Sequence, residues 1–312
     1  MKEKISFVIP IFNEEENIPE LYTRLVNSIK KDFSDFDYEI ILVNDGSTDS
    51  SQKQLEALHQ KDNKVKVIEF SRNFGHHIAI TAGLDYAEGD YVVMMDGDLQ
   101  DQPEEVIKLY DLLKSGKFDI VYGHRAHNKF GFFKRFFSKM FNVIFKFLLN
   151  ESFVISNTIF QIMTKQVVEN IRDLREQNRF IVGIIGWLGF SQGVQAVEHA
   201  KRYKGKTKYS FSKQVGLALN AIFSFSDYLL KLINKIGFSF ILFSVGLITY
   251  ALYKKIVFDS PVSGWTSLII SIFLIGGIQL IVLGIMGEYI GRTYMEIKKR
   301  PLYIVRKKIG KL

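Results

Sequence analysis

The stretch "VVMMDGDLQDQPEE", from Val92 to Glu105, ends a nearly continuous apolar run in three aspartates, Asp96, Asp98 and Asp101. Carboxylates this close together repel one another, so the arrangement costs free energy unless a positive group lies beside them. That group could be a metal ion or a basic side chain, or water alone could solvate the three charges. The rest of the sequence has to distinguish these possibilities.

Apolar bursts alternate with amphipathic stretches along the first part of the chain. Five bursts have the length and composition of buried strands: "ISFVIPIF" (5–12), "YEIILVND" (38–45), "VKVIEFS" (65–71), "DYVVMMD" (90–96) and "FDIVYGHR" (118–125). Apolar residues at helical spacing predict a helix from Ile18, and further helices are expected from Asp49 and over 76–87. This alternation predicts βαβ units, and hence an α/β fold with a mostly parallel sheet covered on both faces.

Polar residues follow the predicted strands at the points where the strands end. They are Asn13, Asp45, Ser71, Asp96, Asp98, His124 and Arg125. In sheets of this type, ligands bind beyond the carboxyl ends of the strands. Residues that are far apart in the sequence are therefore expected to converge on one site there.

The acidic stretch has both a structural and a functional interpretation. Asp101 is a credible helix cap, with Pro103 at an early helical position. Asp96 and Asp98 need a cation, and Gly97 between them lets the backbone approach a ligand closely. Oxygen ligands favour Mg²⁺ or Mn²⁺, and Mg²⁺ characteristically joins one or two carboxylates to substrate phosphates. The stretch therefore predicts a metal-assisted site for a nucleoside diphosphate.

Composition narrows the class of protein. The 312 residues are 47% hydrophobic, and 41 Lys and Arg against 33 Asp and Glu give a net charge of +8. A basic chain suits nucleic acid, anionic lipid or a phosphorylated substrate. Nucleic acid is the weaker choice, because the basic residues gather beside apolar stretches, where anionic lipid explains them better. The chain has no cysteine, which excludes disulfides, thiolate metal sites and a cysteine nucleophile.

The segment 128–234 is basic and crowded with phenylalanine. At helical spacing, "FGFFKRFFSKMFNVIFKFLL" (130–149) has one apolar face with Lys134, Arg135, Lys139 and Lys146 at its margins. Such a helix either lies at a membrane surface or packs in a core with its lysines solvated, and the sequence leaves both open. The stretch "SFSKQVGLALNAIFSFSDYLLKLI" (210–233) is a second candidate of the same type.

Two uncharged stretches follow, Ile236–Tyr253 and Ser260–Gly287. A membrane span needs about 20 apolar residues as helix, so both stretches are expected to cross the membrane as a hairpin. A buried hairpin of a soluble protein is the alternative. The chain opens directly into a strand rather than a secretory leader, and basic residues crowd the tail after the second stretch. The positive-inside rule then places the first domain and both termini in the cytoplasm, at the inner membrane. The glycines of "GGIQLIVLG" would permit close helix contact, and so a homo-oligomer.

Five spaced motifs carry a resemblance to a known family. They are "VIPIFNEEENI" (8–18), "VNDGSTD" (43–49), "SRNFG" (71–75), "TAGLDYAEGDYVVMMDGDLQDQPE" (81–104) and "RYKGKTKYS" (202–210). Together they resemble the GT-A family 2 glycosyltransferases, and within them the polyprenyl-phosphate glycosyltransferases related to dolichol-phosphate mannose synthase. The similarity covers nearly the whole length, including the ending "GEYIGRTYMEIKKRPLYIV".

The resemblance implies roles for particular residues. Those implied for the nucleotide pocket are Pro10, Phe12, Asn13, Glu14, Asp45 and Gly97, with Asp45 on the base. Asp96, Asp98 and Gln100 would bind the metal and the diphosphate. Those implied for the acceptor phosphate are Arg125, Lys134, Arg135 and Ser138. Arg202 resembles the arginine that closes over the donor or acceptor phosphates, so Asp96, Asp98, Arg125 and Arg202 form the implied catalytic set.

The resemblance also implies an organisation and a reaction. The parts are a nucleotide-sugar-binding core (1–127), an acceptor-binding part with interfacial helices (128–234), two transmembrane helices (235–290) and a basic cytoplasmic tail (291–312). The reaction is inverting, metal-dependent transfer of a sugar, best taken as glucose from UDP-glucose, to undecaprenyl or another polyprenyl phosphate.

Two other functions compete with this transfer. A processive polysaccharide synthase needs more spans and a Q-x-x-R-W string, which this chain lacks. A non-enzymatic scaffold of lipid-linked glycan export would not need the intact acidic residues. Gln161 stands where relatives often carry arginine, and His76 where many carry lysine or glutamine, which leaves the sugar and the acceptor open.

Overall fold

The computed structural model describes residues 2–125, 158–200 and 264–311, with scattered residues between 203 and 257. Contacts divide the chain into two compact units, of which the first contains 1–140, 151–215 and 301–312. The second contains 141–150 and 216–300. The predicted interfacial helix (130–149) and parts of the first predicted span (236–253) lie outside the described residues.

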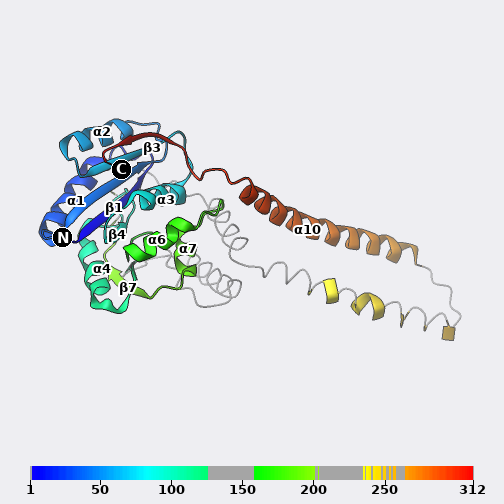
Figure 1. The fold of residues 1–312 in the computed structure, drawn as a ribbon. Coiled ribbons are helices and arrows are strands. Elements are labelled where there is room, and N and C mark those ends of the chain that lie inside the picture. Colours follow the sequence, from blue (N-terminus) through cyan, green and yellow to red (C-terminus); the bar gives the residue numbers. More distant parts are fainter. Residues whose placement is uncertain are drawn as a thin grey trace. The chain divides into compact units, whose positions relative to one another are not determined.

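The first unit is built on one eight-stranded sheet (Figure 1). Its strands are β1 (Lys4–Ile11), β2 (Asp37–Asn44), β3 (Val65–Phe70), β4 (Tyr91–Met94), β5 (Ile120–Arg125), β6 (Gln161–Thr164), β7 (Gln192–Val197) and β8 (Val305–Ile309). Their order is β7-β5-β6-β4-β1-β2-β3-β8. β1 pairs in parallel with β2 and β4, β2 with β3, and β5 with β7, whereas β6 and β8 run antiparallel to their neighbours.

Helices cover both faces of this sheet (Figure 1). They are α1 (Ile18–Asp32), α2 (Ser51–Lys61), α3 (His76–Tyr86), η1 (Pro103–Glu105), α4 (Val106–Leu112), η2 (Leu113–Lys117), α6 (Lys165–Asp173) and α7 (Ile181–Trp187). One core cluster joins α1, α2 and α4 to one face, and a second joins α3, α6 and α7 to the other. The α/β prediction is thus confirmed, with all five predicted strands and the helices between the first four.

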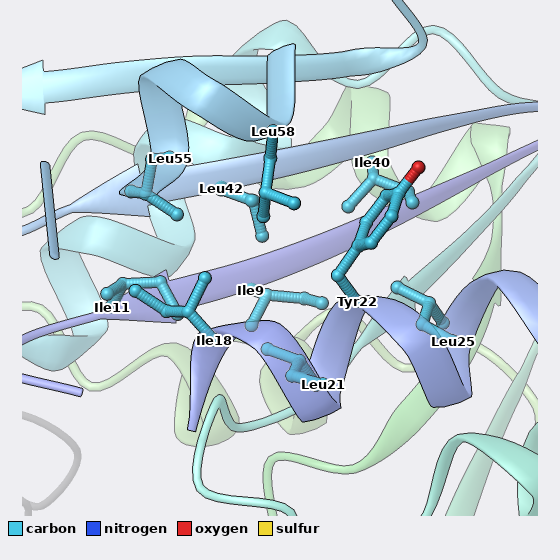
Figure 2. A pocket seen from close by; sticks show the side chains of 10 residues that line it. All are labelled: Ile9, Ile11, Ile18, Leu21, Tyr22, Leu25, Ile40, Leu42, Leu55 and Leu58. Carbon is cyan, nitrogen blue, oxygen red and sulfur yellow. The ribbon is translucent and has the colours of Figure 1, made fainter. Parts of the chain in front are cut away.

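The period of two along β1 explains how one strand serves two cores. Ile5, Phe7 and Ile9 belong to the cluster under α1, whereas Val8 belongs to the opposite cluster. Successive side chains of a strand point to opposite faces, so an apolar run is needed where both faces are covered. Under α1 and α2, apolar side chains surround a cavity too small for more than about one water molecule (Figure 2). Its lining is almost entirely aliphatic, which marks it as core packing rather than a ligand site.

Three strands, β6, β7 and β8, were not predicted from the sequence. β6 and β7 come from the part predicted to bind the acceptor, yet they pair with β4 and β5 of the predicted donor core. β8 comes from the part predicted to be a basic tail, and it pairs antiparallel with β3. Tyr303, just before β8, stacks on Phe70 at 5.0 Å between ring centroids and donates a hydrogen bond to Asp85 (2.7 Å). The last residues of the chain are therefore part of the sheet unit.

The second unit contains α10 (Trp265–Ile297), which includes most of the second predicted span and continues ten residues past its end at Gly287. Leu274–Ile297 is long and apolar enough to cross a membrane, and none of its most apolar window is buried. This composition fits the predicted span better than a buried core helix. Leu274–Ile297 is the one such helix among the residues that the structure describes.

A buried acid stabilises the amino-terminal edge of the sheet. Glu39 is 2% exposed and forms ion pairs of 2.8 Å with both Lys4 and Lys66. Ser6 Oγ also donates to it (2.5 Å). Burial alone would raise the pKa of Glu39, but these hydrogen bonds outweigh it and hold the pKa below its ordinary value of 4.5. A carboxylate with a depressed pKa stabilises the folded state above that value and loses this effect as the pH falls.

We expect Glu39→Gln to lower the free energy of unfolding by about 3–5 kcal/mol, because it leaves two lysines beside a neutral buried group. The variant should also lose the part of the acid sensitivity that appears below about pH 4.5 in the parent protein. Thermal unfolding of the detergent-solubilised chain between about pH 2 and pH 8 measures both effects. Glu88→Gln is the matched control, since Glu88 pairs with the same lysines but is 65% exposed. Equal losses in the two variants would contradict the role given to burial.

Candidate active site

Four loops meet at the carboxyl edge of the sheet, because β1, β2, β3 and β4 run parallel to one another there. They follow Ile11, Asn44, Phe70 and Met94. These loops contain most of the residues that the sequence placed in the nucleotide and metal sites. The structure therefore brings Asn13, Asp45, Asp96 and Asp98 to one edge, as predicted.

The loops after β1 and β2 are tied together by hydrogen bonds. The backbone N–H of Asn13 donates to Ser47 Oγ (2.9 Å), and the side-chain Oδ1 of Asn13 accepts from the backbone N–H of Thr48 (2.8 Å). Glu14 N–H donates to Ser51 Oγ (3.1 Å). Asn13 has a positive φ of 52°, which a non-glycine residue rarely adopts. Of the residues predicted for the nucleotide pocket, Pro10 is buried in β1, and Phe12 and Glu14 are partly buried beside this junction.

Asp45 closes the loop after β3 onto the loop after β2. Its carboxylate accepts the N–H groups of Phe74 (2.6 Å) and Gly75 (3.0 Å), and the residue is 3% exposed. Burial raises the pKa of Asp45, and the two N–H groups only partly offset it. Gly46 has a φ of +67°, and a Cβ on it would lie 2.5 Å from the Arg72 carbonyl carbon. The two loops therefore pack backbone against backbone, which only glycine permits.

The loop after β4, which contains Asp96, Asp98 and Asp101 and is called the acidic loop below, packs closely against β1 and has strained backbone. A Cβ on Gly97 would lie 2.7 Å from Ile11 Cδ1, so the loop lies directly against the end of β1. Asp98 is 6% exposed, and its Oδ1 accepts the Gln100 N–H (3.0 Å). Leu99 has a φ of +62° although its side chain is buried. Backbone strain of this kind costs about 1–3 kcal/mol and clusters at functional sites.

Two of the three described non-glycine residues with positive φ, Asn13 and Leu99, lie at this edge of the sheet. The third, Lys299, lies just beyond the end of α10. These φ values describe the backbone, so they are evidence separate from the identity of the side chains at this edge. They mark the same edge as the functional part of the molecule.

Asp101 is not the helix cap that the sequence predicted. Gln102 takes the N-cap position of η1, without a side-chain cap bond, although Pro103 does open the helix. The Asp101 carboxylate lies instead 3.6 Å from His199 Nδ1, and burial raises its pKa. The error arose because the partner is almost a hundred residues away in the sequence.

The segment after β7 runs along the acidic loop. The Ala200 N–H donates to the Gln100 carbonyl (3.0 Å), and the Tyr203 N–H to the Asp98 carbonyl (3.5 Å). Arg202 lies between these two residues in sequence but outside the described residues, as do Lys134, Arg135 and Ser138. Arg125 ends β5, and only its backbone is described. The phosphate-binding roles predicted for these five residues stay predictions.

His76 is the site residue that the sequence analysis did not select. Its Nε2 lies 3.1 Å from Asp96 Oδ1. Burial alone would lower the pKa of His76, but the charges of Asp96, Asp45 and Asp98 outweigh it and raise the pKa. His77, next to it, has a pKa lowered to about 4 by burial. The signal in the sequence is the motif "SRNFGHH" that follows β3, because it places a histidine, His76, at the start of α3 beside the carboxylates.

The residues present fit a divalent cation that receives part of its coordination from a substrate. Asp96 and Asp98 supply carboxylate oxygens, and the described residues contain no group of three or more potential metal-ligating side chains. Mg²⁺ and Mn²⁺ sites of this kind use one or two carboxylates together with substrate phosphates. Gln100, predicted as a further ligand, is partly buried in the same loop.

Gln161, which replaces an expected arginine, is fully buried at the start of β6. It pairs with Met94, the last residue of β4, and its Nε2 lies 3.5 Å from Met94 Sδ. Its strand partner Met94 is two residues before Asp96, so Gln161 lies close to the start of the acidic loop.

Comparison with known proteins agrees with this geometry. Residues 6–179 match glycosyl transferase family 2. The chain is 38% identical over 307 residues to the prophage bactoprenol glucosyl transferase homolog of Escherichia coli, covering 97% of this chain and 99% of that protein. It is 41% identical over 309 residues to an uncharacterized glycosyltransferase, YkcC, of Bacillus subtilis, covering 98% of this chain and 94% of the relative.

Solved structures share the fold at low sequence identity. A mannosyltransferase from Pyrobaculum calidifontis, in complex with GDP-Man and Mn²⁺, has a TM-score of 0.50 at 14% identity, covering 72% of this chain and 64% of its own. Glucosyl-3-phosphoglycerate synthase from Mycobacterium tuberculosis has a TM-score of 0.50 at 17% identity, covering 71% and 76%. The fold is thus the GT-A fold. With this sheet, this acidic edge and full-length relatives, the chain belongs to glycosyl transferase family 2.

Proposed function

We propose that the protein transfers glucose from UDP-glucose to a polyprenyl phosphate, such as undecaprenyl phosphate, at the cytoplasmic face of the membrane. The observation that carries this proposal is the match over 97% of the chain to a protein named for bactoprenol glucosyl transfer. The match extends beyond the sheet unit into the unburied apolar helix. A lipid acceptor requires such a helix or another membrane attachment, whereas a soluble acceptor does not.

On this proposal, the four loops at the carboxyl edge hold the donor. Pro10, Phe12, Asn13 and Glu14 line the nucleotide pocket after β1, Asp45 lies on the side of the base, and Gly97 gives the diphosphate access to the backbone. Asp45 already accepts two backbone N–H groups, so a contact with the base would use a remaining lone pair of its oxygens. The Asn13 and Asp45 hydrogen bonds fix the loops before the nucleotide arrives, which lowers the entropy cost of binding.

Asp96 and Asp98, with Gln100, are proposed to hold Mg²⁺ or Mn²⁺. Such an ion acts as a Lewis acid that stabilises charge on a leaving diphosphate. The protein's part is to keep two carboxylates together at the end of β4, which the close fit of Gly97 against β1 achieves. The carboxylates repel one another without a cation, so the site is built for binding one.

The acceptor is a phosphate monoester, whose second pKa lies near 6, so it is largely ionised at neutral pH. No strong general base is therefore required for attack on the anomeric carbon. A single in-line displacement inverts the configuration there. The demand on the protein is to place two anionic substrates side by side, which is the proposed role of Arg125, Lys134, Arg135, Ser138 and Arg202.

The membrane arrangement is part of the proposal. α10 and the uncharged stretch Ile236–Tyr253 are proposed to cross the bilayer as a hairpin, with the sheet unit and both termini in the cytoplasm. The basic residues that follow α10, at positions 298–300, suit the anionic cytoplasmic leaflet.

We expect Asp98→Asn to reduce glucose transfer at least about 100-fold, because it removes charge from the metal site and with it several kcal/mol of stabilisation. Transfer of radiolabel from UDP-glucose to undecaprenyl phosphate, in membranes containing the protein, measures this directly. Glu104→Gln is the matched control, since Glu104 is 47% exposed and pairs with Arg24 rather than with the site. Labelled product that persists in Asp98→Asn, or in the presence of EDTA, would contradict the metal role. UDP release without labelled lipid would contradict the acceptor.

A second prediction concerns the backbone contact between the loops after β2 and β3. We expect Gly46→Ala to weaken UDP binding at least about 10-fold, because its Cβ would force the two loops apart. Gly116→Ala is the control, since Gly116 has a similar φ of +76° but nothing within 4 Å of the added Cβ. Isothermal titration with UDP and Mn²⁺ compares the two variants. Equal affinities would show that the loop contact does not shape the nucleotide site.

A further inference from the structure

The imidazole of His76 lies against the acid that precedes Gly97. Its Nε2 is 3.1 Å from Asp96 Oδ1, a contact at ion-pair distance without the alignment of a full hydrogen bond, and this oxygen is buried even though the Asp96 side chain as a whole is 37% exposed. The exposed part of the carboxylate therefore includes the other oxygen, Oδ2. One oxygen faces the histidine and the other faces outward from the loop.

The imidazole is held in place by its surroundings. His76 is the first residue of α3, after Gly75, whose φ of +103° sets the direction in which the chain enters the helix. Asp45 fixes that turn by accepting the N–H groups of Phe74 and Gly75. The ring also lies 5.8 Å from the ring of His77, which packs edge-on against Phe180 at 5.4 Å. The fixed turn and the His77 ring together restrict the His76 imidazole, so it can orient the Asp96 carboxylate.

The contact with Asp96 needs a hydrogen on Nε2, because a carboxylate accepts but does not donate. The protonated ring and one neutral tautomer both meet this requirement, so the orientation of Asp96 does not depend on the charge of His76. A donor at this position fixes the rotation of the carboxylate about its Cβ–Cγ bond. A metal-ligating carboxylate is ordinarily fixed by such a neighbour.

We propose that His76 is a positioning residue for the metal: its Nε2, 3.1 Å from Asp96 Oδ1, holds that oxygen by a contact at ion-pair distance so that Oδ2 is presented to the divalent cation. The inference rests on the proposed function, since it assumes that Asp96 binds a cation together with a nucleoside diphosphate. It adds a residue of α3 to a site otherwise built from the loops after β1, β2 and β4. Loss of a neighbour of this kind typically costs 10- to 100-fold in metal affinity.

Direct metal binding tests the role without relying on activity. The full-length protein in detergent is titrated with Mn²⁺ in the presence of UDP, and free Mn²⁺ is measured by electron paramagnetic resonance. We expect His76→Ala to raise the dissociation constant for Mn²⁺ about 10- to 100-fold. His76→Gln should stay close to the parent value, because the amide nitrogen of glutamine can reproduce the donor at Nε2. In transfer assays the Mn²⁺ half-saturation should rise in His76→Ala, while kcat at saturating Mn²⁺ changes little.

The controls separate this inference from the proposed function. His59→Gln removes a histidine whose Nδ1 contacts the Val65 carbonyl, at the amino end of β3 and so at the opposite edge of the sheet, and should bind Mn²⁺ like the parent. Asp98→Asn should abolish binding. If Asp98→Asn loses Mn²⁺ and His76→Ala does not, or binds it more tightly, the role of His76 is wrong and the metal site stands. If the parent protein with UDP binds no Mn²⁺, both proposals fail. Thermal unfolding of each variant identifies a loss caused by misfolding, and His76→Gln then carries the test: an affinity at least 10-fold below the parent's would overturn the inference.

Discussion

The central constraint on this structure is the repulsion between two aspartates held close together at the end of a buried strand. Asp96 and Asp98 follow a buried strand, one of them 6% exposed, in a loop that also forces Leu99 into a positive φ. Repulsion and strain together favour a different conformation, and the surrounding contacts prevent it. Gly97 lies against β1, His76 lies against Asp96, and the segment after β7 bonds to the carbonyls of the loop. On the proposed function, a divalent cation neutralises the two aspartates and offsets this cost.

The sheet supplies the rigidity that the loops need. Parallel strands bring four loops to one edge, and both faces are covered by helices whose apolar side chains fill the two cores. The buried Glu39 cluster lies at the opposite edge, where it joins β1, β2 and β3 by ion pairs. Charge is thus used in two ways in one sheet. At the amino edge Glu39 is paired with two lysines of the protein, and at the carboxyl edge the aspartates are proposed to bind a cation.

The sequence predicted the part of the fold that follows from hydrophobic pattern. The first five strands are apolar bursts, and the helices between the first four have clear boundaries, so their order and parallel pairing could be foreseen. β6 is four residues long and begins with a buried glutamine, whereas β8, "VRKKI", reads as a basic tail because it is an edge strand with exposed lysines. Pattern does not identify such strands, because their partners rather than their composition place them in the sheet.

The candidate site was foreseen to the same extent and for the same reason. Polar residues at strand ends predicted Asn13, Asp45, Asp96 and Asp98 at one edge, and the resemblance gave them roles. The contacts between loops were not foreseen. The sequence predicts a cap at Asp101 because Pro103 is close in sequence, whereas the partner of Asp101 in the structure, His199, is distant in sequence. His76 is similar: its role comes from a contact across two loops that no spacing rule predicts.

The most direct test of the central claim is the position of the metal itself. Crystals of the full-length protein with UDP and Mn²⁺, measured at the manganese absorption edge, show where the ion lies. The account predicts one anomalous peak about 2.1 Å from carboxylate oxygens of Asp96 and Asp98, and in contact with both phosphates of UDP. A bound UDP whose diphosphate is held only by basic side chains, with no manganese at the acidic loop, would contradict it.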